Sequence, residues 1–330
     1  MASVTTIQFP VDLPVAKRGE HWYARGGDRE VRLSNLPKIF WPDEGYTKGD
    51  LLTYYFNISP VMLPHLVDRP LTLKRMPNGV KGPFFYEKNA PSHRPRWMPT
   101  IPVPSDGRSK TINFLAVTDV LEMLWIANLG CIEFHPLHAQ GTDQTRPSYA
   151  FFDLDPFEPA TWDDVMHVAH LIKMVLDRFG ISSYPKTSGA TGMQIMIPLT
   201  QEETYDEVRG FVGTISDLVH QADPSTTTLE WEVSKRSGKV FLDVNMNREG
   251  ANIAAAYSVR PEPGGTVSTP FSWDESDDIR PEYFTMETIW DRIATIEDPF
   301  APVATGPGHS LKPAIKELGA EPRKAREIRR

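Results

Sequence analysis

Residues 149–155 read YAFFDLD, a short and mostly apolar run that we interpret as a β-strand. Side chains two positions apart in a strand lie on the same face of a sheet. Asp153 and Asp155 therefore point to one face, whereas Phe152 and Leu154 point into the core. The strand brings two carboxylates together near its end.

The segments on either side of this strand alternate between helical and extended patterns. The spacing of apolar residues predicts helices over 112–129, 162–179, 203–221 and 284–296. Another helix is expected to open at the capping box of Thr47 and Asp50. Strands are predicted at 131–137, 181–187 and 193–199, on both sides of a turn at 77–79, and as a hairpin of 229–234 with 239–245. Because these elements follow no strict parallel order, the expected fold class is mixed α+β.

Composition divides the chain of 330 residues into three expected parts. Residues 1–30 are polar and irregular and are expected to form an N-terminal arm. Residues 31–300 are expected to form the main domain. Residues 301–330 shift to Gly, Pro and basic residues, which is typical of a flexible tail.

The net charge of −8 is unevenly distributed. Residues 1–110 hold 16 Lys and Arg against 10 Asp and Glu, residues 111–300 hold 12 against 30, and residues 301–330 hold 7 against 3. This asymmetry suits a basic surface for a polyanion beside an acidic region that could hold cations. A solvated acidic face is the alternative.

Several classes of protein are excluded by composition. The single cysteine, Cys131, rules out a disulfide framework and a cysteine-based zinc site, and it favours a reducing cytoplasm. No apolar run is long enough for a transmembrane helix. The first residues lack a basic patch followed by an apolar stretch, so no secretory signal is expected.

The acids of the 149–155 strand are candidate metal ligands. Adjacent carboxylates repel unless a cation lies between them, and hard oxygen ligands select Mg²⁺ or Mn²⁺. A strand that simply ends at Asp155 before a turn is the alternative. Asp243 interrupts the apolar run VFLDV at 240–244, and a charge there is costly without a partner. If this strand lies beside the first, three carboxylates converge; if not, Asp243 faces solvent on an edge strand.

Three further features could bind phosphates or bases. Ser188 to Gly192 is a loop whose glycines let backbone N–H groups approach a phosphate, although most such loops are plain turns. His135 shares a strand face with Glu133, and a structural role is its alternative. The stretch 69–97 is basic and aromatic, so it offers lysines for phosphates and rings for stacked bases. Its alternative is a buried aromatic strand with lysines on the wet side.

Taken in order, the motifs resemble the polymerase domain of bacterial DNA ligase D, a member of the archaeo-eukaryotic primase superfamily. The resemblance runs from about Val31 to Ile296. It is carried by LSNLPKIFWP, YTKGDLLTYY, PHLVDRPLTLKRMPNGV, FFYEKNAP, IEFHP, FFDLDP, KTSGATG, KVFLDVN and AYSVRPEPGGTVSTPFSW. It implies two packed sheet-and-helix modules, one of them RRM-like, with the active cleft between them. The sequence shows no ligase or nuclease module, so a stand-alone form of the domain is expected.

The resemblance also implies a function and a set of site residues. The expected enzyme is a template-dependent nucleotidyltransferase that extends primers at short gaps and double-strand-break ends, prefers ribonucleotides and uses two Mn²⁺ or Mg²⁺ ions. Asp153, Asp155 and Asp243 match the family's catalytic metal ligands. The incoming nucleotide is expected to contact His135, Ser188, Gly189, Thr191, Gln194, Arg236 and Arg260. A downstream 5′-phosphate is expected at Asn35, Lys38, Lys48 and Lys74, and template stacking at Phe85 and Tyr86.

The implied partners are gapped or broken 5′-phosphorylated DNA, NTP or dNTP, an ATP-dependent ligase and a Ku-type protein, in a nucleoid-associated bacterial cytoplasmic setting without a membrane. Thr191 and Gln194 depart from the family pattern, which commonly has Lys and His there. The departure supports an alternative, a DNA-end-binding or gap-binding scaffold with reduced polymerase activity. A metal-dependent phosphohydrolase or sugar transferase would explain the acids, but it leaves the 69–97 stretch without a role.

Overall fold

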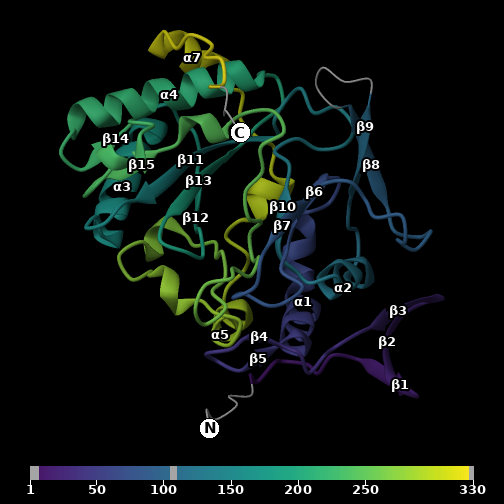
Figure 1. Ribbon diagram of the computed structural model, residues 1–330. Coiled ribbons are helices and arrows are strands. Elements are labelled where there is room, and N and C mark those ends of the chain that lie inside the picture. Colours follow the sequence, from purple (N-terminus) through teal and green to yellow (C-terminus); the bar gives the residue numbers. More distant parts are fainter. Residues whose placement is uncertain (1–6, 105–109, 327–330) are drawn as a thin grey trace. The chain divides into compact units, whose positions relative to one another are not determined.

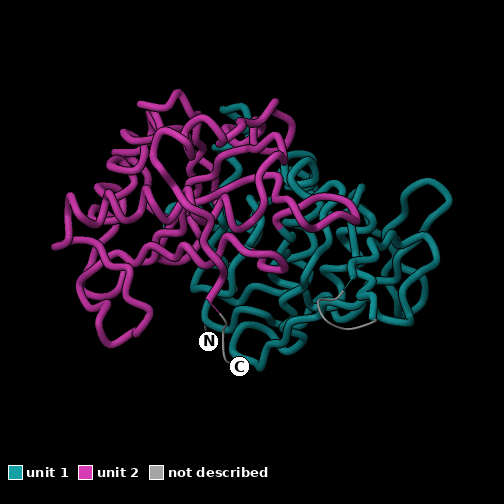
Figure 2. Tube along the Cα trace, turned by 90° about the horizontal axis from the view of Figure 1, so that it is seen from above, with its two compact units in different colours: residues 1–137, 253–268, 282–298 teal, residues 138–252, 269–281, 299–330 magenta. Residues whose placement is uncertain are grey.

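The computed structural model describes residues 7–104 and 110–326 (Figure 1). The chain divides into two compact units, and neither of them is continuous in sequence (Figure 2). The first unit comprises residues 1–137, 253–268 and 282–298, and the second comprises residues 138–252, 269–281 and 299–330. Each unit contains helices and sheets, which confirms the mixed α+β class.

The second unit is built on a five-stranded sheet that carries the acidic strand at its centre. The strand order is β12 (Tyr184–Thr187), β13 (Met193–Pro198), β11 (Tyr149–Pro156), β15 (Val240–Leu242) and β14 (Thr227–Thr228). All neighbours are antiparallel except β14 and β15, which are parallel. Most of β11 is buried, as its nearly continuous apolar run requires.

Two helices, α3 (Trp162–Arg178) and α4 (Tyr205–Ala222), pack against β11 and against each other, and so cover one face of this sheet (Figure 1). Thr161 and Thr204 begin them with complete capping boxes, in which the threonine side chain and the third helical residue satisfy each other's backbone N–H groups. Their apolar stripes recur at helical spacing and are buried.

The first unit has a sheet in the order β10 (Cys131–Pro136), β6 (Leu71–Arg75), β9 (Thr111–Leu115) and β8 (Thr100–Pro104), with β7 (Phe85–Glu87) also paired to β6. Helix α1 (Lys48–Met62) starts at the predicted capping box of Thr47 and packs against α2 (Val120–Asn128). Smaller elements are β4 (Ile39–Trp41), β5 (Tyr46–Thr47) and α5 (Ile289–Thr295).

Residues predicted as an irregular arm contain a three-stranded antiparallel sheet, β1 (Val15–Arg18), β2 (His21–Gly26) and β3 (Arg29–Leu33). Tight turns at Gly19 and Gly27, both with positive φ, connect the strands. Ala24, Val31 and Leu33 are buried, and this burial offsets the polar composition on which the prediction rested.

The C-terminal residues form α6 (Ala301–Thr305), α7 (Lys312–Leu318) and a final segment, 321–326, that follows α4. The Arg323 N–H donates to the Asp206 carbonyl over 2.9 Å. A flexible tail was expected from composition, whereas the described residues of this segment are packed. Residues 327–330 lie outside the described residues.

Two element predictions were wrong. The helix predicted over 112–129 is β9 followed by α2, because residues 111–115 pair with β8 and Asp119 caps the helix only afterwards. The predicted hairpin is absent from the described chain, because Arg236 donates to the Glu230 and Trp231 carbonyls and holds that segment as a loop. β15 pairs instead with β11 and β14.

Within the described residues, no helix is both long and apolar enough to cross a lipid bilayer.

Candidate functional site

The structure brings Asp153 and Asp243 to opposed positions on neighbouring strands. β11 and β15 pair with Leu154 opposite Leu242, so the residue before one faces the residue after the other. The Asp243 N–H donates to the Asp153 carbonyl over 3.1 Å. Asp155 follows two positions along β11, so all three predicted acids lie at the same end of one strand pair.

Burial and repulsion make this cluster costly without a counter-charge. Burial raises the pKa of the Asp153 carboxyl well above its usual range, and Asp155 and Asp243 raise it further. Burial also raises the pKa of Asp243. Oxygen donors that repel one another in this way fit a hard divalent cation, which would relieve the repulsion. No group of three His, Cys, Asp or Glu in the described chain is already gathered tightly enough to hold a metal ion.

A buried lysine is linked to Asp153 through Gln194. The Lys186 side chain is 1% exposed, and its Nζ donates to Gln194 Oε1 over 2.7 Å. Gln194 Nε2 then donates to Asp153 Oδ1 over 2.7 Å. The strand register explains this chain of contacts, because Lys186 lies opposite Gln194 and Gln194 lies opposite Asp153. Sequence analysis missed Lys186, although a lysine in the strand YPKT was a usable signal.

The loop at 188–192 is fitted against β11. Ser188 Oγ accepts the N–H groups of Ala190 and Gly192, which closes the loop on itself. A Cβ on Gly192 would lie 2.2 Å from the Leu154 carbonyl oxygen and 3.3 Å from Asp155 Oδ1. Only glycine therefore fits at this position, and the loop lies directly beside the acids. Gly189 has positive φ, and Thr191 is exposed.

Arg236 stabilises the loop that precedes β15 through hydrogen bonds. Its Nε and Nη2 donate to the Glu230 and Trp231 carbonyls over 2.8 and 2.6 Å. Its guanidinium carbon lies 3.5 Å from the centroid of the Phe241 ring. The side chain is thus engaged in holding residues 230 and 231 in place beside Asp243.

The first unit gathers His135, Arg260 and Lys74 around Glu133, which sequence analysis did not include among its site residues. Glu133 is fully buried, and its carboxylate lies 2.5 Å from Lys74 Nζ, 2.7 Å from His135 Nε2 and 3.3 Å from Arg260 Nε. Burial alone would raise the pKa of Glu133, but His135, Arg260 and Lys74 outweigh it and hold the pKa at about 2.

One ring nitrogen of His135 has no hydrogen-bond partner among the described residues. Burial lowers its pKa, which favours the neutral ring, and its Nδ1 is buried without a hydrogen-bond partner in the described chain. Such an atom requires an explanation, and a ligand contact supplies one.

A second basic group surrounds the start of α1. Lys48 Nζ donates to the Ser34 carbonyl and to Asn128 Oδ1, both over 2.8 Å, and forms no ion pair with a described residue. Burial, then the charges of Lys38 and Arg75, lower the pKa of Lys48 to about 8. Lys38 Nζ donates to the Pro77 carbonyl, and its N–H donates to the Asn35 carbonyl. Lys74 belongs to the Glu133 cluster rather than to this group.

The aromatic residues of the 69–97 stretch are exposed. Phe84, Phe85 and Tyr86 have exposed fractions of 54%, 45% and 53%. The Arg75 guanidinium lies 5.1 Å from the Phe85 ring centroid, and the Tyr86 and His135 rings are 5.9 Å apart. Exposed rings supported by cations fit stacked bases better than a buried core.

Comparison with known protein families identifies the family of this chain. The family model described as "LigD, primase-polymerase domain" matches residues 47–300. The chain belongs to this family. It is therefore a LigD primase-polymerase domain, the class of DNA-directed nucleotidyltransferase that the sequence predicted.

Two curated relatives are similar in sequence to most of this chain. The chain is 31% identical over 275 residues to the multifunctional non-homologous end joining protein LigD of Mycolicibacterium smegmatis, with 83% of this chain covered. It is 35% identical over 275 residues to the bifunctional non-homologous end joining protein LigD of Bacillus subtilis, with 82% of this chain covered. The match spans only 36% and 44% of those two proteins.

A solved structure confirms the fold. The polymerase domain of Mycobacterium tuberculosis ligase D, in complex with DNA, matches with a TM-score of 0.78 and 30% identity. The match covers 83% of this chain and 98% of that domain.

Proposed function

We propose that this LigD primase-polymerase domain extends a primer strand across short gaps or at broken DNA ends during end joining. The observation that carries the proposal is the opposed pair of Asp153, buried on β11, and Asp243, half-buried directly after β15, both with raised carboxyl pKa values. Phosphoryl transfer needs mainly cations and positioning, and this cluster offers a place for the cations.

Asp153, Asp155 and Asp243 are proposed to hold two Mn²⁺ or Mg²⁺ ions. Bound there, such ions would activate the attacking hydroxyl and stabilise the leaving phosphate. Gln194 orients the Asp153 carboxylate, and Lys186 supplies a buried positive charge behind it. Ser188, Gly189 and Thr191 are proposed to contact the nucleotide triphosphate, and the close approach of Gly192 in the same loop to Asp155 supports this.

His135 and Arg260 are proposed to contact the incoming nucleotide, and Glu133 holds both side chains in place. Arg236 acts indirectly, by holding the segment beside Asp243. We also propose that the enzyme prefers ribonucleotides.

The group at the start of α1 is proposed to bind the downstream 5′-phosphate. Support comes from Lys48, a buried ammonium held by neutral oxygens, and from the neighbouring Lys38 and Asn35. A dianionic phosphate would supply the missing counter-charge. Phe85 and Tyr86 are proposed to stack on the template, and a ligase and a Ku-type protein in a bacterial cytoplasm are the proposed partners.

The test is extension of a labelled primer across a short gap with Mn²⁺ and NTP or dNTP. Asp153→Asn and Asp243→Asn should each reduce the rate by roughly a thousandfold, equivalent to about 4 kcal/mol. Both variants should keep their affinity for the gapped DNA. A wild-type chain that binds the gap without extending the primer would instead favour the scaffold alternative that Thr191 and Gln194 suggest.

A further inference from the structure

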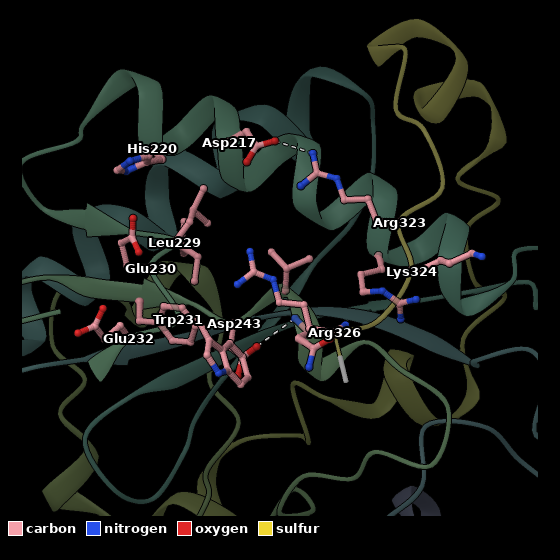
Figure 3. A pocket seen from close by; sticks show the side chains of 15 residues that line it. Asp217, His220, Leu229, Glu230, Trp231, Glu232, Asp243, Arg323, Lys324 and Arg326 are labelled. Atoms are coloured by element: carbon pink, nitrogen blue, oxygen red, sulfur yellow. Dashed lines mark hydrogen bonds and ion pairs between the residues drawn. The ribbon is translucent and has the colours of Figure 1, made fainter. Parts of the chain in front are cut away.

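The second unit contains a pocket of about 760 Å³ beside Asp243 (Figure 3). Its walls come from α4, from the 229–232 loop, from the end of β15 and from the C-terminal segment 321–326. Figure 3 shows Arg323, Lys324 and Arg326 along one side of the pocket and Glu230, Trp231 and Glu232 along the other. The C-terminal segment lies beyond residues 47–300, which the family model matches.

The C-terminal segment is built into the unit by close packing on two glycines of α4. A Cβ on Gly210 would lie 2.2 Å from the Glu321 carbonyl oxygen, and a Cβ on Gly213 would lie 2.4 Å from Arg323 Nη1. A larger residue at Gly210 would push the backbone of the segment off the helix, whereas one at Gly213 would displace the Arg323 side chain. The absence of both side chains therefore creates the groove in which the segment lies.

Hydrogen bonds fix the same segment. Arg323 pairs with Asp217 over 2.5 Å, and the Arg326 N–H donates to Asn245 Oδ1 over 2.9 Å. This second bond determines the orientation of the Asn245 amide, because only its oxygen can accept. The segment is thus anchored two residues after Asp243, through backbone atoms and Arg323.

The anchored segment adds positive charge that the pocket does not neutralise. Lys324 and Arg326 are exposed and form no ion pair with any described residue. Apart from Asp243, which is assigned to the metal ions, the acids on the pocket wall are already paired: Asp217 with Arg323, and Glu230 and Glu232 with Lys235.

Two buried donors of pocket-lining residues, Asn245 Nδ2 and Arg209 Nε, also lack a hydrogen-bond partner in the described chain. These two donors, together with Lys324 and Arg326, favour an anion.

The opposite wall of the pocket carries the exposed indole ring of Trp231. Trp231 is 41% exposed, and Arg236 and the Phe241 ring hold it in position. Cations on one side and an exposed indole on the other suit a nucleic-acid strand, with phosphodiesters at the cations and a base against Trp231.

We propose that the 321–326 segment completes a binding site for the primer strand, with Lys324 and Arg326 as positioning residues for its phosphodiesters. The inference rests on the proposed function, because Asp243 shares the pocket and is assigned to the metal ions that the primer end must reach. Neither residue touches the reacting atoms.

The test compares the double variant Lys324→Ala with Arg326→Ala against a matched double variant, Lys312→Ala with Lys316→Ala, on α7 outside the pocket. The probe is a short single-stranded oligonucleotide ending in a 3′-hydroxyl, titrated without metal or nucleotide across a salt series. The pocket variant should bind about tenfold more weakly, with a salt slope reduced by up to two phosphate contacts. In extension assays its KM for primer should rise while kcat stays unchanged.

A second variant reaches the same site without removing a charge. Gly210→Ala places a methyl group against the Glu321 carbonyl and displaces the segment, while alanine favours the helix. It should reproduce the loss of oligonucleotide binding. Trp231→Ala should weaken binding without altering the salt slope, because stacking releases no counterions.

The outcomes separate the two proposals. Equal losses of oligonucleotide binding in the pocket and α7 variants would overturn the inference. It would also be overturned if the pocket variant bound inorganic phosphate more weakly but bound the oligonucleotide as the wild type does. If the wild-type chain extends primers and the pocket variant keeps its KM, only the inference fails. If the wild-type chain extends no primer, the proposed function fails, whether or not the 321–326 segment binds the oligonucleotide.

Discussion

A single buried ammonium gives the proposed 5′-phosphate site a pH dependence. The pKa of Lys48 lies at about 8, below its usual value of 10.5, because burial and the charges of Lys38 and Arg75 disfavour the protonated form. Lys48 therefore loses its proton as the pH rises through 8 in the free protein. The preference for a gap with a 5′-phosphate over one with a 5′-hydroxyl should then weaken between pH 7 and pH 9.

Lys48→Arg separates this effect from general changes in charge, because arginine stays protonated throughout that range. The variant should show no pH-dependent loss of preference, whatever its absolute affinity. The measurement is binding of both gaps by fluorescence anisotropy at fixed ionic strength. The same pH slope in the variant and the wild type would place the titration elsewhere.

The contacts of Gln194 assign it a role at Asp153. Gln194→Leu removes the bridge between Lys186 and Asp153 while keeping a similar volume. The Mn²⁺ concentration for half-maximal extension should rise about tenfold, the effect expected when the partner that orients a metal ligand is removed. KM for the nucleotide at saturating Mn²⁺ should stay unchanged. A variant that changes nucleotide KM alone would instead place Gln194 at the triphosphate.

Among the elements, the starts of α1 and α3 were the most predictable from sequence. α1 and α3 begin where the capping boxes of Thr47 and Thr161 predicted, because a cap is satisfied by residues within one turn. The 229–245 region was mispredicted because its conformation depends on Arg236, which fixes the carbonyls of residues 230 and 231 from outside any local pattern.

The cap of α3 has a measurable energetic role. Thr161 Oγ1 accepts the Asp164 N–H, and the Asp164 carboxylate accepts the Thr161 N–H in return. Thr161→Ala should lower the free energy of unfolding by about 1 kcal/mol without altering extension. Thr161→Ser keeps the cap oxygen and should unfold at nearly the wild-type urea concentration. Equal midpoints for all three proteins would show that the cap adds nothing in this setting.

At the scale of the whole molecule, much of the site was predictable as a set of residues but not as a set of contacts. Asp153, Asp155 and Asp243 stood out because charge interrupts apolar strands. Their roles stay predictions. The contacts of Lys186 with Gln194 and of Glu133 with Lys74 depend on strand register, and that of Glu133 with Arg260 on a distant segment, so the sequence did not reveal the roles of Lys186 and Glu133.

Metal binding should stabilise the protein through the repulsion that it relieves. Adding Mn²⁺ at 100 times its dissociation constant should stabilise the native state by about 2.7 kcal/mol and raise Tm. Asp153→Asn should start from a higher Tm without metal, since one buried charge is removed, and should gain little from Mn²⁺. Calorimetry with and without Mn²⁺ measures both, with Ca²⁺ as a control for nonspecific effects. An unchanged wild-type Tm at saturating Mn²⁺ would contradict the proposed metal site.

The discontinuous units have a consequence for how the protein is made. Residues 253–268 and 282–298 belong to the first unit, so a ribosome has produced most of the second unit before the first can be completed. Until Arg260 is synthesised, the buried Glu133 carboxylate lacks one of the side chains that contact it beside Lys74 and His135. The first unit therefore cannot finish folding until residues 253–268 and 282–298 have been synthesised. Fragments cut at the boundary near residue 137 are expected to be poor substitutes for the intact protein.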